Sequence, residues 1–212
     1  MTRAWLLIVG ILAAVSFALT LLVAIPQAML IQLNAPEGLR PYTPSELVGR
    51  RVYIQNGCVY CHSQQVRDPA FTTDVERGWG PRPTFPEDYV YDRPHLLGTM
   101  RTGPDLINVG DRLPDRNWHL IHLYNPRSVV RWSIMPTFPF LFQEKAPSQV
   151  APEDVVVPVA GPYAPQGKVV VAKYEALALV DYLLSLDRTY PPSDDAETGQ
   201  PSNPESPSHH GP

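Results

Sequence analysis

Apolar residues form one long unbroken run at the start of the chain. From Ala4 to Ile25 there is no charged residue, and Leu, Ile, Val, Ala and Phe dominate. A helix of about 22 residues at 1.5 Å each spans roughly 33 Å, close to a hydrocarbon core of about 30 Å. A signal-peptide core is shorter, about 7–15 residues, and ends at a small-residue cleavage site that this stretch lacks. We therefore predict a membrane anchor over residues 1–33, with a cleaved signal peptide as the alternative.

Three shorter segments carry helical signals. The sequence TPSE at 43–46 has a capping threonine, a proline suited to the first helical position and a glutamate three residues after the cap. It predicts a helix that ends near Gly57. KYEALALVDYLLSL at 173–186 has apolar residues at helical spacing and predicts a second helix. A short helix is expected over 115–124, ended by Asn-Pro.

These patterns divide the chain into four parts: an anchor at 1–33, a linker at 34–43, a compact domain at 44–190 and a tail at 191–212. Within the domain, residues 66–100 are expected to form a long loop, and residues 142–172 a proline-rich insertion. In this insertion Val155–Val159 and Val169–Ala172 are predicted to pair as a small hairpin. The tail has almost no side chain to bury, which predicts disorder.

Composition narrows the possible functions. There are 25 prolines in 212 residues, more than twice the usual share of about 5%, which predicts much loop. Both cysteines lie in one tetrapeptide, so no disulfide framework is available. The formal net charge of −4 comes without a basic patch, and we therefore expect no nucleic-acid partner.

Cys58, Cys61 and His62 form a C-x-x-C-H motif, the attachment pattern of a c-type haem. Two thiols in one turn can reach the two vinyl groups on one edge of a porphyrin, and the next residue then lies over the iron. A thioredoxin-like site is the first alternative, but it needs a preceding strand. A zinc site is the second, with His119 and His122 as further ligands. The motif predicts one covalent haem c with His62 as an iron ligand.

The sixth iron ligand is less directly indicated. Methionine opposite histidine raises the reduction potential and suits electron transfer, whereas an open position suits gas binding. Beyond the anchor the candidates are Met100 and Met135, and Pro136 stiffens the loop that carries Met135. The alternative is bis-histidine ligation through one of three further histidines: His95, His119 or His122.

The sequence TGPDL at 102–106 resembles the Gly-Pro-x-Leu loop of class I cytochromes c. The resemblance implies that the Pro104 carbonyl accepts a hydrogen bond from His62, which fixes the ring and raises its basicity. It also implies a mainly α, class I cytochrome c-like fold, to which the residue pattern adds the anchor helix, the long loops and the disordered tail. In such a fold Gly49 and Tyr53 lie against the C-terminal helix near Tyr182 and Leu183.

Five blocks in order resemble the mono-haem subunit II of cbb3-type cytochrome c oxidases: CVYCHSQQVR (58–67), VYDRPHLLG (90–98), RTGPDLINVG (101–110), NWHLIHLYNPRSVV (117–130) and SIMPTFPFL (133–141). The resemblance extends over roughly residues 1–142. It implies that His62 and Met135 are the two axial ligands and that Met100 is not one. Departures such as Arg131-Trp132, where Val-Pro is common, leave the ligands in place.

The resemblance implies an electron-transfer subunit that makes no substrate bond itself. Its partners would be a multi-span haem-copper catalytic subunit and a cytochrome c-type donor. It implies a single-pass protein of the bacterial cytoplasmic membrane, with the haem domain on the outer side. Arg101 and Arg127 are candidates to pair with haem propionates, and His119 and His122 could do so or help docking. The alternatives are a nitric oxide reductase subunit, a haem-based sensor and a zinc-binding adaptor.

Overall fold

The computed structural model of the chain describes residues 2–192. They divide into two units, each described by itself: one with residues up to 39 and 85–90, the other with residues 40–84 and 91–190. The predicted disordered tail lies outside the described residues from 193 onward.

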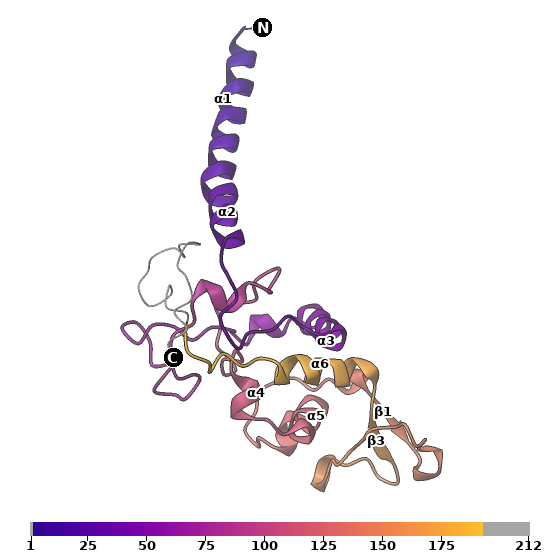
Figure 1. Cartoon of the computed structure of the whole chain (residues 1–212). Coiled ribbons are helices and arrows are strands. Elements are labelled where there is room, and N and C mark those ends of the chain that lie inside the picture. The colour runs from indigo at the N-terminus through magenta and orange to yellow at the C-terminus, as the bar shows by residue number, and fades with distance from the viewer. Residues whose placement is uncertain (1, 193–212) are drawn as a thin grey trace, which may run out of the picture. The chain divides into compact units, whose positions relative to one another are not determined.

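The N-terminal unit is built on one continuous helical rod (Figure 1). It consists of α1 (Thr2–Leu19), a π-helical turn (Thr20–Ala24) and α2 (Ile25–Ile31). Pro26 lacks an N–H and its ring clashes with the carbonyl four residues earlier, so the wider π turn before it lets the helix continue. The stretch from Arg3 to Ile31 has a mean hydropathy of 2.8 in its most apolar window and no buried residue there. It is long and apolar enough to cross a membrane.

Helix α3 (Pro44–Gln55) begins where the sequence predicts. Thr43 accepts a hydrogen bond from the Glu46 N–H at 3.3 Å, and the Glu46 carboxylate accepts one from the Thr43 N–H at 2.7 Å. Arg40 pairs with the same carboxylate at 2.6 Å. The predicted capping box is therefore confirmed, and it also fixes the end of the linker.

Helix α6 (Tyr174–Leu184) packs on α3 through the main core of the domain (Figure 1). The two backbones approach so closely that a Cβ added to Gly49 would overlap the Ala178 carbonyl. Tyr53 meets Tyr182 edge to face, with ring centroids 5.7 Å apart. The predicted contact of Gly49 and Tyr53 with the C-terminal helix is confirmed at Tyr182.

Two shorter helices, α4 (Val109–Arg112) and α5 (Arg116–Tyr124), flank α6. The helix expected over 115–124 is therefore present as α5, with Asp115 as its N-cap. Short 3-10 helices interrupt the irregular segments of the described chain: Cys58–Tyr60, Pro86–Tyr89, Pro126–Ser128, Pro139–Leu141, Pro147–Gln149 and Gly161–Tyr163. Residues 66–100 contain only turns and one of these 3-10 helices, which confirms the predicted loop.

The insertion forms a three-stranded antiparallel sheet in the order β1-β3-β2. Strand β2 (Val156–Val157) pairs with β3 (Val169–Ala172), which confirms the predicted hairpin. The prediction omitted β1 (Phe142–Lys145), where only Phe142 is buried and the polar remainder carries no strand pattern. The regular structure of the domain consists of mixed helices with little sheet, which agrees in part with the expected mainly α class, and the class I cytochrome c likeness stays a prediction.

A buried ionic group joins three parts of the second unit. Asp92 accepts a hydrogen bond from Arg50 of α3 at 3.2 Å and one from the Tyr42 hydroxyl at 3.1 Å. Arg188, just after α6, lies 3.7 Å from the same carboxylate. Burial, followed by the charge of Asp92, raises the pKa of Tyr42 to about 12. Because removing one partner of a buried ion pair leaves the other uncompensated, these residues hold the loop against both helices.

The Gly49 contact generates a stability prediction. Gly49→Ala forces a methyl group into the Ala178 carbonyl, so it should lower the free energy of unfolding by about 2 kcal/mol although alanine is the better helix former. Denaturant unfolding of the full chain in detergent measures this. Gly10→Ala is the matched control, because no atom lies within 4 Å of the added Cβ there. Equal stability of the two variants would contradict the close approach.

Candidate haem site

Cys58, Cys61 and His62 lie in a single turn directly after α3. Gly57 ends the helix with φ +67°, a left-handed conformation suited to glycine, and redirects the chain. The N–H groups of Cys61 and His62 both donate to the Cys58 carbonyl, at 3.1 and 3.0 Å. Both thiols are free, with Cys58 partly buried and Cys61 exposed. Burial raises the pKa of the Cys58 thiol to about 11.

The ring of His62 is held by the Pro104 carbonyl. Its Nδ1 lies 2.7 Å from that oxygen, and because a carbonyl only accepts, Nδ1 carries the proton. Nε2 therefore keeps the lone pair that a metal ion needs. Burial lowers the pKa of His62 more than the Pro104 bond raises it, and the Arg112 charge lowers it further. The predicted hydrogen bond is therefore present, and burial favours the neutral form of the ring.

Gly103 provides the space in which the His62 ring lies. A Cβ added at Gly103 would overlap the imidazole, and the Gly103 N–H donates to the Cys61 carbonyl at 2.9 Å. The ring is thus bounded by backbone on one side, and the Nε2 lone pair stays available for a ligand bond. Two free thiols and this imidazole are the donor set that a covalent haem requires, so the residues fit the group.

Met135 and Met100 lie in different surroundings. Met135 is partly buried at the margin of the core cluster that Cys58 and Leu106 also contact, and its N–H donates to the Ser133 hydroxyl at 3.2 Å. Met100 is 58% exposed. This placement agrees with Met135 as the candidate for the sixth ligand, and the assignment stays a prediction.

The three other candidate histidines differ in environment. His95 is exposed, and His119 is buried with its Nε2–H donating to the Leu113 carbonyl at 2.8 Å. His122 stacks on Trp118 at 4.6 Å, and its buried Nδ1 has no hydrogen-bond partner among the described residues. Within residues 2–192 no group of three His, Cys, Asp or Glu side chains could hold a metal ion. The described residues therefore offer no set of ligands for the alternative zinc site.

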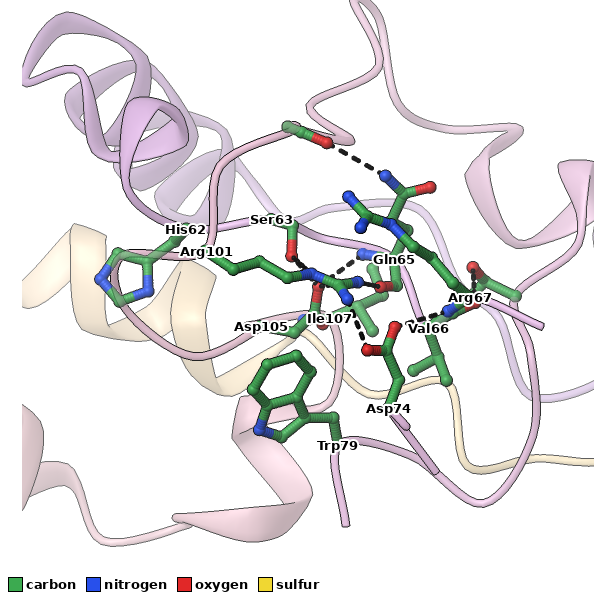
Figure 2. Close-up of polar contacts among 12 residues, drawn as sticks. His62, Ser63, Gln65, Val66, Arg67, Asp74, Trp79, Arg101, Asp105 and Ile107 are labelled. Atoms are coloured by element: carbon green, nitrogen blue, oxygen red, sulfur yellow. Dashed lines mark hydrogen bonds and ion pairs between the residues drawn. The ribbon is translucent and has the colours of Figure 1, made fainter. Parts of the chain in front are cut away.

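Arg101 lies in a polar cluster beside His62 (Figure 2). It donates to the Ser63 hydroxyl and the Gln65 carbonyl, each at 2.8 Å, and pairs with Asp74. Its guanidinium also lies over the Trp79 ring, 5.0 Å from the centroid. The guanidinium of Arg101 is therefore already engaged by groups of the protein. Its binding to a haem propionate stays a prediction.

Two charged residues near His62 were not singled out from the sequence. Asp105 is fully buried and accepts hydrogen bonds from both segments that meet beside the ring. Arg112 donates to the Asp105 carbonyl, and its buried Nε has no partner among the described residues. The TGPDL block contains Asp105, but nothing local in the sequence indicates its partners, which lie about 40 positions earlier.

Burial of His122 generates a pH prediction. Burial, then the charges of His119 and His62, lower its pKa to about 4 from 6.5. Below pH 6.5 the unfolded chain binds a proton that the folded chain excludes, so stability is lost as the pH falls towards 4. His122→Phe keeps a ring against Trp118 and should remove up to about 2 kcal/mol of the loss between pH 7 and pH 5. Urea unfolding at pH 8, 7 and 5 measures this, and an unchanged pH dependence would contradict it.

Comparison with known proteins assigns the chain to a family. The model of the family described as cytochrome c oxidase, mono-haem subunit/FixO matches residues 1–186. A search of curated proteins finds no relative. The match extends over the N-terminal helix, the cysteine turn, the Pro104 loop and α6, so it supports one haem and a place in an oxidase complex. The chain belongs to the FixO family of mono-haem subunits of cytochrome c oxidase.

Proposed function

We propose that this chain binds one haem c covalently through Cys58 and Cys61 and serves as the electron-transfer subunit of a cbb3-type haem-copper oxidase. His62 and Met135 would ligate its iron. The observation that carries the proposal is the His62–Pro104 hydrogen bond, because it leaves Nε2 free to ligate beside two free thiols in the same turn. When bound, the haem supplies an iron that gains and loses one electron.

The chain's own residues hold the ligands in place and exclude water from one side. Gly103 lets the backbone lie against the His62 ring, and Leu106 and Cys58 extend the apolar core to the site. A histidine–thioether pair gives a higher reduction potential than two histidines. Such a site accepts and passes electrons and makes no substrate bond, so the oxygen chemistry belongs to the catalytic subunit.

The apolar helix from Arg3 to Ile31 would anchor the subunit in the bacterial cytoplasmic membrane. Covalent haem attachment favours the outer side for the domain, and Arg3 favours the inner side for the N-terminus. In this topology the subunit, with haem held by Cys58, Cys61 and His62, would take electrons from a cytochrome c-type donor and deliver them to the membrane-embedded catalytic subunit. The family match supports the oxidase over the nitric oxide reductase and sensor alternatives.

The axial assignment has a direct test. Met135→His replaces the thioether by an imidazole and should lower the midpoint potential while keeping the iron low-spin. Redox titration, optical spectra and electron paramagnetic resonance of the full-length, haem-loaded protein measure this. Met100→His is the matched control, since Met100 is largely exposed, and should leave the spectra unchanged. If the histidine–methionine signature survives in Met135→His, Met135 is not the ligand.

The role in an oxidase is tested at the level of the complex. When the tagged full chain is purified from its native membrane, a multi-span haem-copper subunit should co-purify with it. The complex should reduce oxygen with a reduced cytochrome c as electron donor. A complex that instead reduces nitric oxide, or a chain that elutes without such a subunit, would overturn the proposed partner. Rapid carbon monoxide binding to the reduced haem of this chain would favour the sensor.

A further inference from the structure

Two backbone segments run side by side and in the same direction next to the His62 ring. The Gly103 N–H donates to the Cys61 carbonyl, and the Leu106 N–H donates to the Ser63 carbonyl, each at 2.9 Å. The ring bond of His62 to the second segment lies between these two bonds. The length of that ring bond therefore depends on how firmly the two segments are held together.

Asp105 connects the same two segments through its side chain. One carboxylate oxygen accepts from the Ser63 hydroxyl at 2.5 Å and from the Gln65 N–H at 2.8 Å. The other oxygen accepts from the Ile107 N–H at 2.8 Å. Asp105 directly follows the residue whose carbonyl binds His62, and Ser63 directly follows His62. The carboxylate thus joins the two chains next to the ring bond.

The charge of Asp105 is balanced within the protein (Figure 2). Arg101 lies 3.9 Å from its carboxylate and donates to the Ser63 hydroxyl, which in turn donates to Asp105. Asp74 pairs with Arg101 from the other side and accepts the Arg67 N–H at 2.9 Å. Asp105 and Ser63 are 0% exposed. Every carboxylate bond is therefore made away from bulk water, where it depends strongly on position.

Joining two loops through a buried charge costs desolvation free energy. Apolar side chains of similar volume often stabilise a fold as well as or better than a buried ion pair, but they impose no fixed direction. Three hydrogen bonds to one carboxylate do impose direction, because each requires a donor within about 3 Å and in line. The arrangement is suited to holding a distance.

We propose that Asp105 is a positioning residue for the iron ligand: by joining Ser63 and Gln65 to the Pro104 loop, it sets the strength of the His62–Pro104 hydrogen bond. This inference rests on the proposed function. A strong bond from Nδ1–H makes the imidazole a more basic ligand and favours ferric iron. Loosening the segments weakens this bond, so it raises the midpoint potential of the haem.

Substitutions of Asp105 separate position from charge. Asp105→Asn keeps the shape, but its amide has one oxygen for three N–H or O–H donors, and its NH₂ group then faces at least one of them. Asp105→Glu keeps the charge and displaces the carboxylate by one methylene. Asp74→Asn is the matched control, because it makes the same chemical change in the same cluster without touching Ser63, Gln65 or Ile107.

The experiment measures two quantities on the full-length, haem-loaded protein: the midpoint potential, and the exchange rate of the His62 Nδ1–H by nuclear magnetic resonance. Asp105→Asn and Asp105→Glu should both raise the midpoint potential. Both should also speed the exchange of the Nδ1–H about tenfold, which corresponds to the loss of roughly one hydrogen bond. Asp74→Asn should leave the exchange rate unchanged. If Asp105→Glu exchanges at the native rate, Asp105 does not position His62, and any change in midpoint potential in Asp105→Asn comes from the lost charge alone.

Folding and the haem itself are controlled separately. If Asp105→Asn does not fold, Ser63→Ala removes one of the three carboxylate bonds and should still speed the exchange, whereas a native rate would overturn the proposal. The exchange readout needs no haem. A native chain without haem absorbance therefore overturns the proposed function, while the exchange rates in that chain still decide whether Asp105 positions His62.

Discussion

The hydrogen bond from His62 to the Pro104 carbonyl is the contact on which the site depends, and it joins residues 42 positions apart. Its existence requires two loops to meet in one register. The first loop begins where Gly57 ends α3, and the second carries Gly103, whose missing side chain makes room for the ring. Since each loop is irregular, neither could hold this geometry alone. The bonds between them and the carboxylate of Asp105 supply the rigidity that secondary structure supplies elsewhere.

The loops are in turn held by the crossing of α3 and α6. The capping box at Thr43 fixes the start of α3, and the approach of Gly49 to Ala178 fixes its distance from α6. Asp92, buried between Arg50 and Arg188, connects the loop between the cysteine turn and Pro104 to α3 and to the segment after α6. A chain with two cysteines in one turn has no structural disulfide to do this. The buried ion pairs of Asp92 with Arg50 and Arg188 replace it, at the cost of their desolvation.

Local signals allowed much of this architecture to be predicted. Short stretches of sequence predict the cap at Thr43, the end of the helix at Gly57 and the hairpin of β2 with β3, and the structure contains all three. The His62–Pro104 bond came from resemblance to a known loop. Strand β1 was not predictable, because its polar residues form a strand only through pairing with β3. The partners of Arg101 and Asp105 were equally hidden, because they are set by tertiary structure alone.

The proposed electron transfer gives these buried charges a physical purpose. A relay works best when its iron ligands move little between the two oxidation states, because any movement adds to the energy of reorganisation. His62 is restrained by a carbonyl, by the backbone of Gly103 and by the pairing of its own segment with the Pro104 loop. Arg101, which lies over the Trp79 ring and pairs with Asp74, lowers the pKa of Asp105 against the burial that raises it. An ordered polar cluster beside His62 would thus give two irregular segments the stiffness that the proposed electron relay needs.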